Sequence, residues 1–181
     1  MEVKSNTFLE CAGLGAFVEL ILAMQDWPKR KEMEQAGSRE EKFAHALQEL
    51  QKISRTHEGM AAELKADGDV ISDRFIMIAV MNMKLIGPRL RLAPHADPSD
   101  GFLDLVFIRK RDRDNFCRWL EGQLPGEKRA ARLESRRCRR IEVSPSNAAP
   151  IHVDSRMIEK PEFPLFIDIA PATLTYAVVR A

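Results

Sequence analysis

The sequence predicts an α+β domain dominated by an antiparallel β-sandwich. From Met60 onward, short apolar runs alternate with turn residues, which is the rhythm of strands in a sheet. A strong helix-capping pattern begins earlier, at Ser38. The 181 residues, of which 45% are hydrophobic, are enough for one core. We therefore expect a single domain over residues 1–181, with a helical insertion at about 29–59.

The N-terminal segment Asn6–Met24 predicts a short strand followed by a buried helix that Trp27-Pro28 closes. Gly13-Leu14-Gly15 lies between the two elements. This Gly-x-Gly lacks the lysine and hydroxyl residue of a phosphate-binding loop and the third glycine of a dinucleotide fingerprint. We interpret it as a close-packing turn.

Two further helices are predicted. Ser38 and Glu41 have capping-box spacing, and one apolar helix face follows them at Phe43, Leu47, Leu50 and Ile53. Asp112–Leu124 has helical apolar spacing, with acidic residues at the end where the helix dipole favours them. The predicted strands, rich in β-branched and apolar residues, are Phe75–Met83, Phe102–Ile108, Arg139–Val143, Ile151–Asp154, Phe166–Ile169 and Leu174–Val179.

The bulk properties exclude several classes of protein. The formal net charge is only +1, so no global field favours nucleic acid or an anionic membrane. Three cysteines with no metal-binding spacing indicate reduced thiols in a cytoplasmic protein. The longest apolar run, Ala12–Met24, contains Glu19 and is shorter than the roughly 20 residues of a membrane span. The N-terminus has no secretory signal pattern.

Three segments carry a resemblance to a known family. Val80–Leu105 reads V-M-N-M-K-L-I-G-P-R-L-R-L-A-P-H-A-D-P-S-D-G-F-L-D-L. Phe8–Gly15 is a phenylalanine-led strand ending in Ala-Gly-x-Gly, and Ile151–Asp154 is a strand ending in aspartate. In this order they resemble the C-terminal, substrate-side domain of the diacylglycerol kinase and sphingosine kinase family of lipid kinases. Pro94, Ala96, Asp100, Gly101 and Leu103 match the family's order.

The resemblance implies half of an enzyme. In the family, a separate N-terminal domain grips ATP with a Gly-Gly-Asp-Gly-Thr loop, and the β-sandwich domain contacts the lipid. No segment of this chain resembles that loop. We therefore expect the ATP-binding domain to be absent, so that ATP is a cofactor only if such a domain is supplied, and we expect the chain to be inactive alone.

Asp154 takes the place of the family's catalytic aspartate, which removes the proton of the lipid hydroxyl. Strand alternation would put His152 and Asp154 on the face opposite Ile151 and Val153, which would let the Asp154 carboxylate face a cleft. A turn or strand-end role is the alternative for Asp154. The family continues with Gly-Glu, whereas this chain has Ser155 and Arg156, and a guanidinium cannot act as a base.

The resemblance also implies a Mg²⁺ site. It would involve Asp100, with Asp97 and Phe102 on either side and backbone carbonyls as further ligands. Asp-Pro-Ser-Asp-Gly is equally a strong turn signal. The family's glycine cluster after its strand asparagine is reduced here to Gly87, followed by Pro88-Arg89, which weakens close backbone approach.

One basic stretch stands out, made up of Arg129, Arg132, Arg136, Arg137, Arg139 and Arg140. It suits an anionic membrane surface, where each basic residue contributes on the order of 1 kcal/mol. Nucleic acid ranks lower because no aromatic residue is interleaved to stack bases. An edge strand protected from mispairing is the structural alternative, and we favour it.

These observations leave three functions open. The first is the substrate domain of a lipid kinase that holds a diacylglycerol-like or sphingoid lipid, with Asp154 as the base. The second is a non-catalytic lipid-binding or regulatory module. The third is a structural domain that forms a homodimer through an edge of the sandwich. Phe17, Leu20, Ile21 and Met24 could line a lipid-tail pocket, but their helical spacing is more typical of core.

Overall fold

The computed structural model describes residues 8, 10–25, 38–87, 90–123, 133–154 and 156–170. Within them the elements run in the order β1 (Cys11–Gly15), α1 (Ala16–Gln25), α3 (Arg39–Thr56), β2 (Met60–Ala66), β3 (Asp69–Met81), β4 (Leu103–Arg109), the 3₁₀ turn η1 (Lys110–Asp112), α4 (Arg113–Glu121), β5 (Ser135–Cys138), β6 (Arg140–Pro145), β7 (Ile151–Val153), β8 (Arg156–Ile158) and β9 (Leu165–Asp168).

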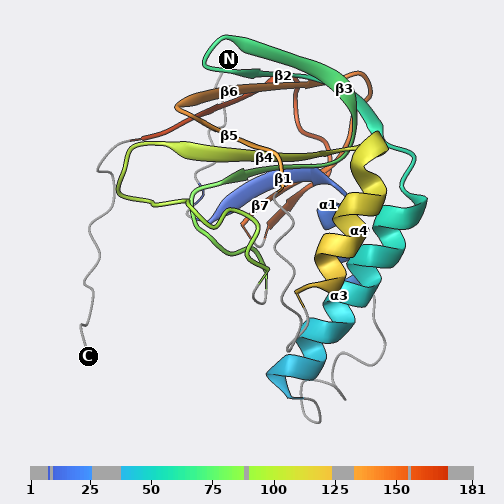
Figure 1. The fold of residues 1–181 in the computed structure, drawn as a ribbon. Helices are drawn as coiled ribbons and strands as arrows, with labels where there is room; N and C mark the ends of the chain where they lie inside the picture. The colour runs from blue at the N-terminus through green and yellow to red at the C-terminus, as the bar shows by residue number, and fades with distance from the viewer. Residues whose placement is uncertain are drawn as a thin grey trace, which may run out of the picture.

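The described strands form one antiparallel sheet around β3. Its order is β8-β7-β1-β3-β2-β6-β9, while β4 pairs with β3 and carries β5. The first half of β3 pairs with β2, and its second half lies with β1 and β4. Because β3 changes partners along its length, the sheet curls, and the helices gather on one side of it (Figure 1).

A β-bulge in β3 lets this strand serve two cores. Phe75 pairs with Arg109 of β4. Met77 pairs with Ile108, which leaves Ile76 as the extra residue of the bulge. Ile76 and Met77 therefore both face the helices, whereas regular alternation would have sent them to opposite faces.

Two apolar cores lie on the two faces of the sheet. The helix-side core packs α1, α3 and α4 against the strands and includes Phe17, Leu47, Leu50, Ile76, Met77, Val106, Phe116 and Trp119. The second core lies on the other face, inside the curl of the sheet, and includes Leu14, Leu64, Phe75, Ile78, Leu105, Phe107, Ile141, Val143 and Val153. The rings of Phe75 and Phe107 meet edge to face, 5.7 Å apart, a favourable aromatic geometry.

Both ends of α3 are satisfied. Ser38 accepts from the Glu41 N–H at 3.2 Å, and the Glu41 carboxylate accepts from the Ser38 N–H at 2.7 Å. At the other end, Arg113 donates to the His57 carbonyl and Arg74 donates to the Gly59 carbonyl at 2.7 Å. Cations at a helix C-terminus complement its dipole, so these contacts anchor α3 to β3 and α4.

The predicted α+β sandwich-like fold and the capping box of α3 are confirmed. Several elements differ from prediction. Gly13-Leu14-Gly15 is not a turn but the end of β1, with α1 starting directly after it. The strand predicted from Phe75 begins at Asp69, and β2, β5 and β8 were not predicted as separate strands. The predicted strand Leu174–Val179 and the Trp27-Pro28 stop lie outside the described residues.

No helix in the described part of the chain is long and apolar enough to cross a membrane. The cysteines are buried and form no disulfide. Burial raises the pKa of Cys11 and of Cys138 to about 12, so both are uncharged thiols at neutral pH.

Gly15→Ala will destabilise the domain more than Gly101→Ala. Both glycines have positive φ, 86° and 75°, which costs a residue with a Cβ about 1–3 kcal/mol. A Cβ at Gly15 would also lie 2.4 Å from the Ile76 carbonyl oxygen, whereas a Cβ at Gly101 meets nothing within 4 Å. Urea unfolding of the two variants measures the difference, and equal losses would contradict the close packing of β1 on β3.

Candidate functional site

Asp154, the predicted catalytic residue, lies in the turn between β7 and β8. Val153 of β7 pairs with Arg156 of β8 directly across this turn. Asp154 has a positive φ of 52°. Asp adopts this conformation more readily than most residues because its short side chain can bond to nearby backbone. Asp154 therefore lies in a turn, as the structural alternative expected, and its catalytic role stays a prediction.

The Asp154 carboxylate holds the start of β1. Its Oδ1 accepts the N–H of Glu10 at 2.9 Å and the N–H of Cys11 at 3.1 Å. The Asp154 N–H in turn donates to the Cys11 carbonyl at 2.8 Å. These bonds fix the orientation of the carboxylate and tie the end of β7 to β1.

The three segments that carry the family resemblance meet at Glu10. The Glu10 carbonyl accepts the N–H of Asn82 at 2.9 Å and of Met83 at 3.3 Å, just after β3. Its own N–H binds Asp154, which is 144 residues away in the sequence. The strand asparagine, the start of β1 and the strand-end aspartate are thus joined by hydrogen bonds at one end of the sheet.

His152, on the strand face predicted to be shared with Asp154, is buried under α1. Its side chain does lie on the opposite face from Ile151 and Val153, but this face is covered by Phe17, whose ring centroid is 5.2 Å away. Desolvation lowers the pKa of His152 to about 4, opposed by the backbone and charge of Asp154. The ring is therefore neutral at pH 7.

Gly13 makes the room that the His152 ring needs. Gly13 pairs with His152 across β1 and β7. A Cβ at Gly13 would lie 2.7 Å from His152 Nε2 and 2.6 Å from the Ile78 carbonyl oxygen. Close packing was the correct part of the prediction for the Gly-x-Gly, but the group packed against it could not be named from the sequence.

In the Asp97–Asp100 loop, the two aspartate side chains accept hydrogen bonds from nearby groups of the same segment. Asp97 Oδ1 accepts from the Ser99 N–H at 2.9 Å and from its hydroxyl at 2.6 Å, and these bonds hold the pKa of Asp97 below its usual value. Asp100 Oδ1 accepts the Phe102 N–H at 2.9 Å. Both aspartates therefore perform the turn chemistry that was the alternative to metal binding.

The loop's positive partner is a guanidinium. Asp100 Oδ2 lies 2.7 Å from Nη2 of Arg137, so both carboxylate oxygens of Asp100 are already engaged. The described residues contain no group of three or more His, Cys, Asp or Glu side chains placed to hold a metal ion. The Asp97 and Asp100 side chains would have to give up these partners to hold the predicted Mg²⁺, which stays a prediction.

The two predicted sites lie at the same end of the sheet but on different strands. Cys11 is hydrogen-bonded to Asp154 and is paired with Met81 of β3 in the sheet. Met81 is paired in turn with Asp104 of β4. The acidic loop leads directly into β4. Strands β7 and β4 are therefore three strand spacings apart, roughly 14 Å along the sheet.

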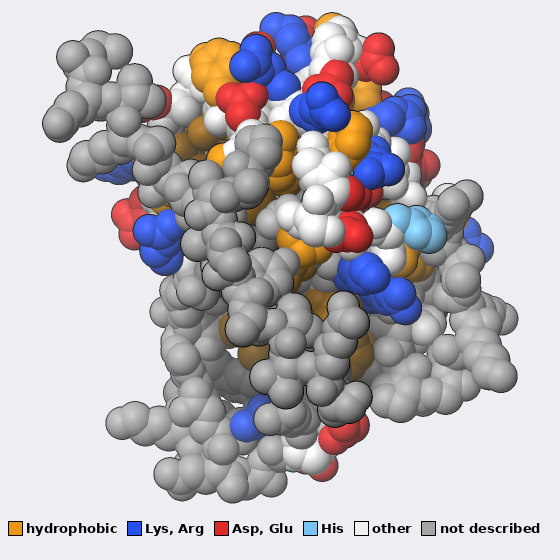
Figure 2. Space-filling model, turned by 90° about the vertical axis from the view of Figure 1, so that its left-hand side faces the viewer, with side chains coloured by type: hydrophobic (Ala, Val, Ile, Leu, Met, Phe, Trp, Pro, Cys, Tyr) orange, Lys and Arg blue, Asp and Glu red, His pale blue; other side chains and the backbone are white. Residues whose placement is uncertain are grey.

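Part of the basic stretch lies on an edge strand, which was the favoured alternative, whereas Arg140 begins β6, which pairs with both β2 and β9. Arg136 and Arg137 belong to β5, which pairs with β4 alone among the described strands. Arg136 pairs with Glu134 at 3.2 Å, and Arg140 pairs with Asp168 at 2.7 Å. On the face shown in Figure 2, basic and acidic side chains are interspersed. Arg129 and Arg132 lie outside the described residues.

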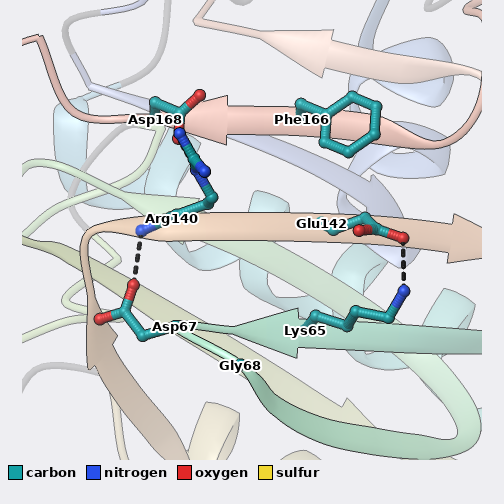
Figure 3. Close-up of a pocket in the computed structure, with 7 residues that line it drawn as sticks. All are labelled: Lys65, Asp67, Gly68, Arg140, Glu142, Phe166 and Asp168. Carbon is teal, nitrogen blue, oxygen red and sulfur yellow. Dashed lines mark hydrogen bonds and ion pairs between the residues drawn. The ribbon is translucent and has the colours of Figure 1, made fainter.

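A hollow of about 510 Å³ lies on the outer face of β2, β6 and β9 (Figure 3). Its lining consists of Lys65, Asp67, Gly68, Arg140, Glu142, Phe166 and Asp168. Lys65 pairs with Glu142 at 2.8 Å, and Asp67 accepts the Arg140 N–H at 2.8 Å. These paired charges cover an open sheet face, and neither Asp154 nor Asp100 lines the hollow.

A smaller pocket, of about 240 Å³, opens between the start of α1 and residues 147–150 and contains His57 and Glu19. His57 Nδ1 accepts the Gly59 N–H at 2.9 Å, and its Nε2 lies 3.4 Å from the Glu19 carboxylate. Burial lowers the pKa of His57, while Glu19 opposes this shift. Both ring nitrogens have partners in the protein, as expected of a structural histidine.

Residues 28–178 match the model of the YegS C-terminal NAD kinase beta sandwich-like domain. The chain belongs to this family. The predicted resemblance to the C-terminal domain of diacylglycerol kinase-like proteins is thereby confirmed. No match was found among curated proteins.

Three solved structures from Bacillus anthracis str. Sterne, two described as a putative diacylglycerol kinase and one as a diacylglycerol kinase, share the fold of this chain. Two are 16% and 17% identical and match 89% of this chain with TM-scores of 0.58 and 0.61. The third is 17% identical and matches 92% with a TM-score of 0.56. The chain spans about half the length of each, 47%, 48% and 54%.

Asp154→Ala will destabilise the domain by about 1–3 kcal/mol, because it leaves the N–H groups of Glu10 and Cys11 without their acceptor. Asp154→Asn will cost less, since the amide keeps an acceptor oxygen and Asn also tolerates positive φ. Chemical denaturation compares the two. Equal losses would show that the carboxylate's bonds to β1 do not matter.

His152 will make stability depend on pH. The folded-state pKa, about 4, lies below the usual 6.5, so the unfolded chain binds the extra proton first and stability falls as the pH drops from 6.5 to 4. The slope reaches about 1.4 kcal/mol per pH unit. His152→Gln removes this component, so the difference in unfolding free energy between wild type and variant should shrink across the same window.

Proposed function

We propose that this chain is the substrate domain of a diacylglycerol kinase-like lipid kinase and that it presents a lipid hydroxyl to ATP bound on a separate nucleotide-binding domain. Membership of the family and the fold shared with three diacylglycerol kinases support this proposal. The observation that carries it is the meeting of the three segments at Glu10, because it builds one polar site around Asp154 from distant parts of the chain.

Asp154 is the proposed general base. A base must lie within hydrogen-bond reach of the attacking hydroxyl, and phosphoryl transfer otherwise depends on positioning and charge neutralisation. The two amides at Oδ1 hold the carboxylate in one orientation. A carboxylate accepts hydrogen bonds through both oxygens, so anchoring one of them is compatible with a role for the group in proton removal.

A non-catalytic lipid-binding module is the second candidate, and a specific observation favours it. Asp154 already has a structural task in joining β7 to β1. Arg156, in the place of the family's glutamate, begins β8 and pairs with Val153. A chain that had lost catalysis could keep Asp154 for folding alone.

The test combines lipid binding with phosphate transfer. Purified chain is sedimented with phosphatidylcholine vesicles that contain or lack diacylglycerol, or contain sphingosine, and is then incubated with labelled Mg-ATP and the same vesicles. We expect saturable binding that depends on the hydroxyl lipid and is retained by Asp154→Asn, because the proposed base acts on the hydroxyl and not on the acyl chains.

Phosphate transfer separates the two candidates. Labelled phosphate in the lipid would support the kinase. If the Asp154→Asn variant is about as stable as wild type but transfers no label, Asp154 is assigned as the base. Binding without transfer, even when the nucleotide-binding domain of a family member is added, would favour the module. Absence of any lipid-dependent binding would rule out both.

A further inference from the structure

The acidic loop before β4, residues Asp97–Asp100, is contacted by Arg137 of the neighbouring edge strand β5. Arg137 stands opposite Asp104 in the pairing of β4 with β5. From there its guanidinium reaches back to the loop, where Nη2 lies 2.7 Å from Asp100 Oδ2. This contact joins residues that are 37 positions apart, so the edge strand and the loop are ordered together.

Phe102 holds the guanidinium in place. The Cζ atom of Arg137 lies 4.2 Å from the centroid of the Phe102 ring, a close cation–π contact. Arg139 lies 4.8 Å from the same ring. The Phe102 N–H, in turn, binds Asp100 Oδ1 at 2.9 Å. Carboxylate, guanidinium and ring thus form one unit, in which each group fixes the next.

In this unit the aspartate oxygens that could bind a divalent cation already have protein partners. Mg²⁺ requires six oxygen ligands in near-octahedral geometry and gives up its water reluctantly. Asp100 has one oxygen on a backbone N–H and the other on Arg137, and Asp97 Oδ1 is bound to Ser99. A guanidinium supplies a permanent positive charge with a planar set of donors, which suits a carboxylate.

We propose that Arg137 takes the place of a divalent cation in this loop, so that the domain keeps the Asp97–Asp100 loop folded without Mg²⁺. The proposal concerns the folding of the loop and does not depend on whether the chain binds lipid or transfers phosphate. Its failure would therefore leave the proposed function untouched.

Thermal unfolding of the purified chain in EDTA, MgCl₂ or CaCl₂ tests the proposal. Wild type should have the same Tm in all three. Arg137→Ala should lower the Tm in EDTA by roughly 2–4 °C, the effect of losing about 1 kcal/mol in a chain of this size. MgCl₂ or CaCl₂ should restore part of this loss, because the aspartates then lack their internal counter-charge.

Arg136→Ala is the matched control. Arg136 is the neighbour on β5, has similar exposure (49% against 55%) and also makes a surface ion pair, but with Glu134. Its Tm should fall less and should not respond to divalent cations. Asp100→Asn added to Arg137→Ala should abolish the cation response and lower the Tm by less than the sum of the single changes.

Three results would overturn the proposal. The first is a Tm of wild type that rises with MgCl₂ and loses this rise in Asp100→Asn, which would show a metal site. The second is an equal loss of Tm in Arg137→Ala and Arg136→Ala. The third is a Tm of Arg137→Ala that neither cation raises, which would reduce the contact to an ordinary ion pair.

Discussion

The pairing of β3 with three partners is the constraint on which the domain depends. Its first half belongs with β2 and its second half lies with β1 and β4, so one strand connects the parts of the curled sheet. The extra residue at Ile76 sets how side chains divide between the two cores. Without the bulge, every position on one side of it would move to the opposite face, because side chains alternate along a strand.

The polar chemistry of the domain lies where β3 and its neighbours begin or end. Backbone groups at strand ends have lost their ladder partners and must find others. Asp154 satisfies two of these groups at the start of β1, and Asp100 satisfies one at the start of β4. The aspartates that attracted a functional interpretation therefore also complete the hydrogen bonding of the sheet. The same sequence pattern at each aspartate therefore fits both a functional role and a role in completing the sheet.

Local patterns were predictable from the sequence, and long-range partners were not. The cap at Ser38 and the core strand after Phe75 follow from spacing and composition alone. In contrast, β5 reads Ser-Arg-Arg-Cys and has no apolar alternation, because it is an edge strand whose first three side chains are exposed and only Cys138 is buried. Because β5 was not predicted, its pairing with β4 was not predicted either. Arg137 reaches Asp100 only through this pairing, so the partner of Asp100 could not be named. The turn at Asp154 was foreseen as an alternative, but its bond to the start of β1 spans almost the whole chain.

The close contact between Gly13 and the His152 ring limits which residues can replace either one during evolution. The backbone of β1 has no room for a Cβ beside the imidazole, and the Ile78 carbonyl closes the other side. A larger residue at position 13 is therefore tolerated only together with a smaller one at position 152 and a local shift of β3. Because the Ile78 carbonyl oxygen would lie 2.6 Å from a Cβ at position 13 whatever residue stood at position 152, glycine should be kept at position 13 among relatives that keep this arrangement.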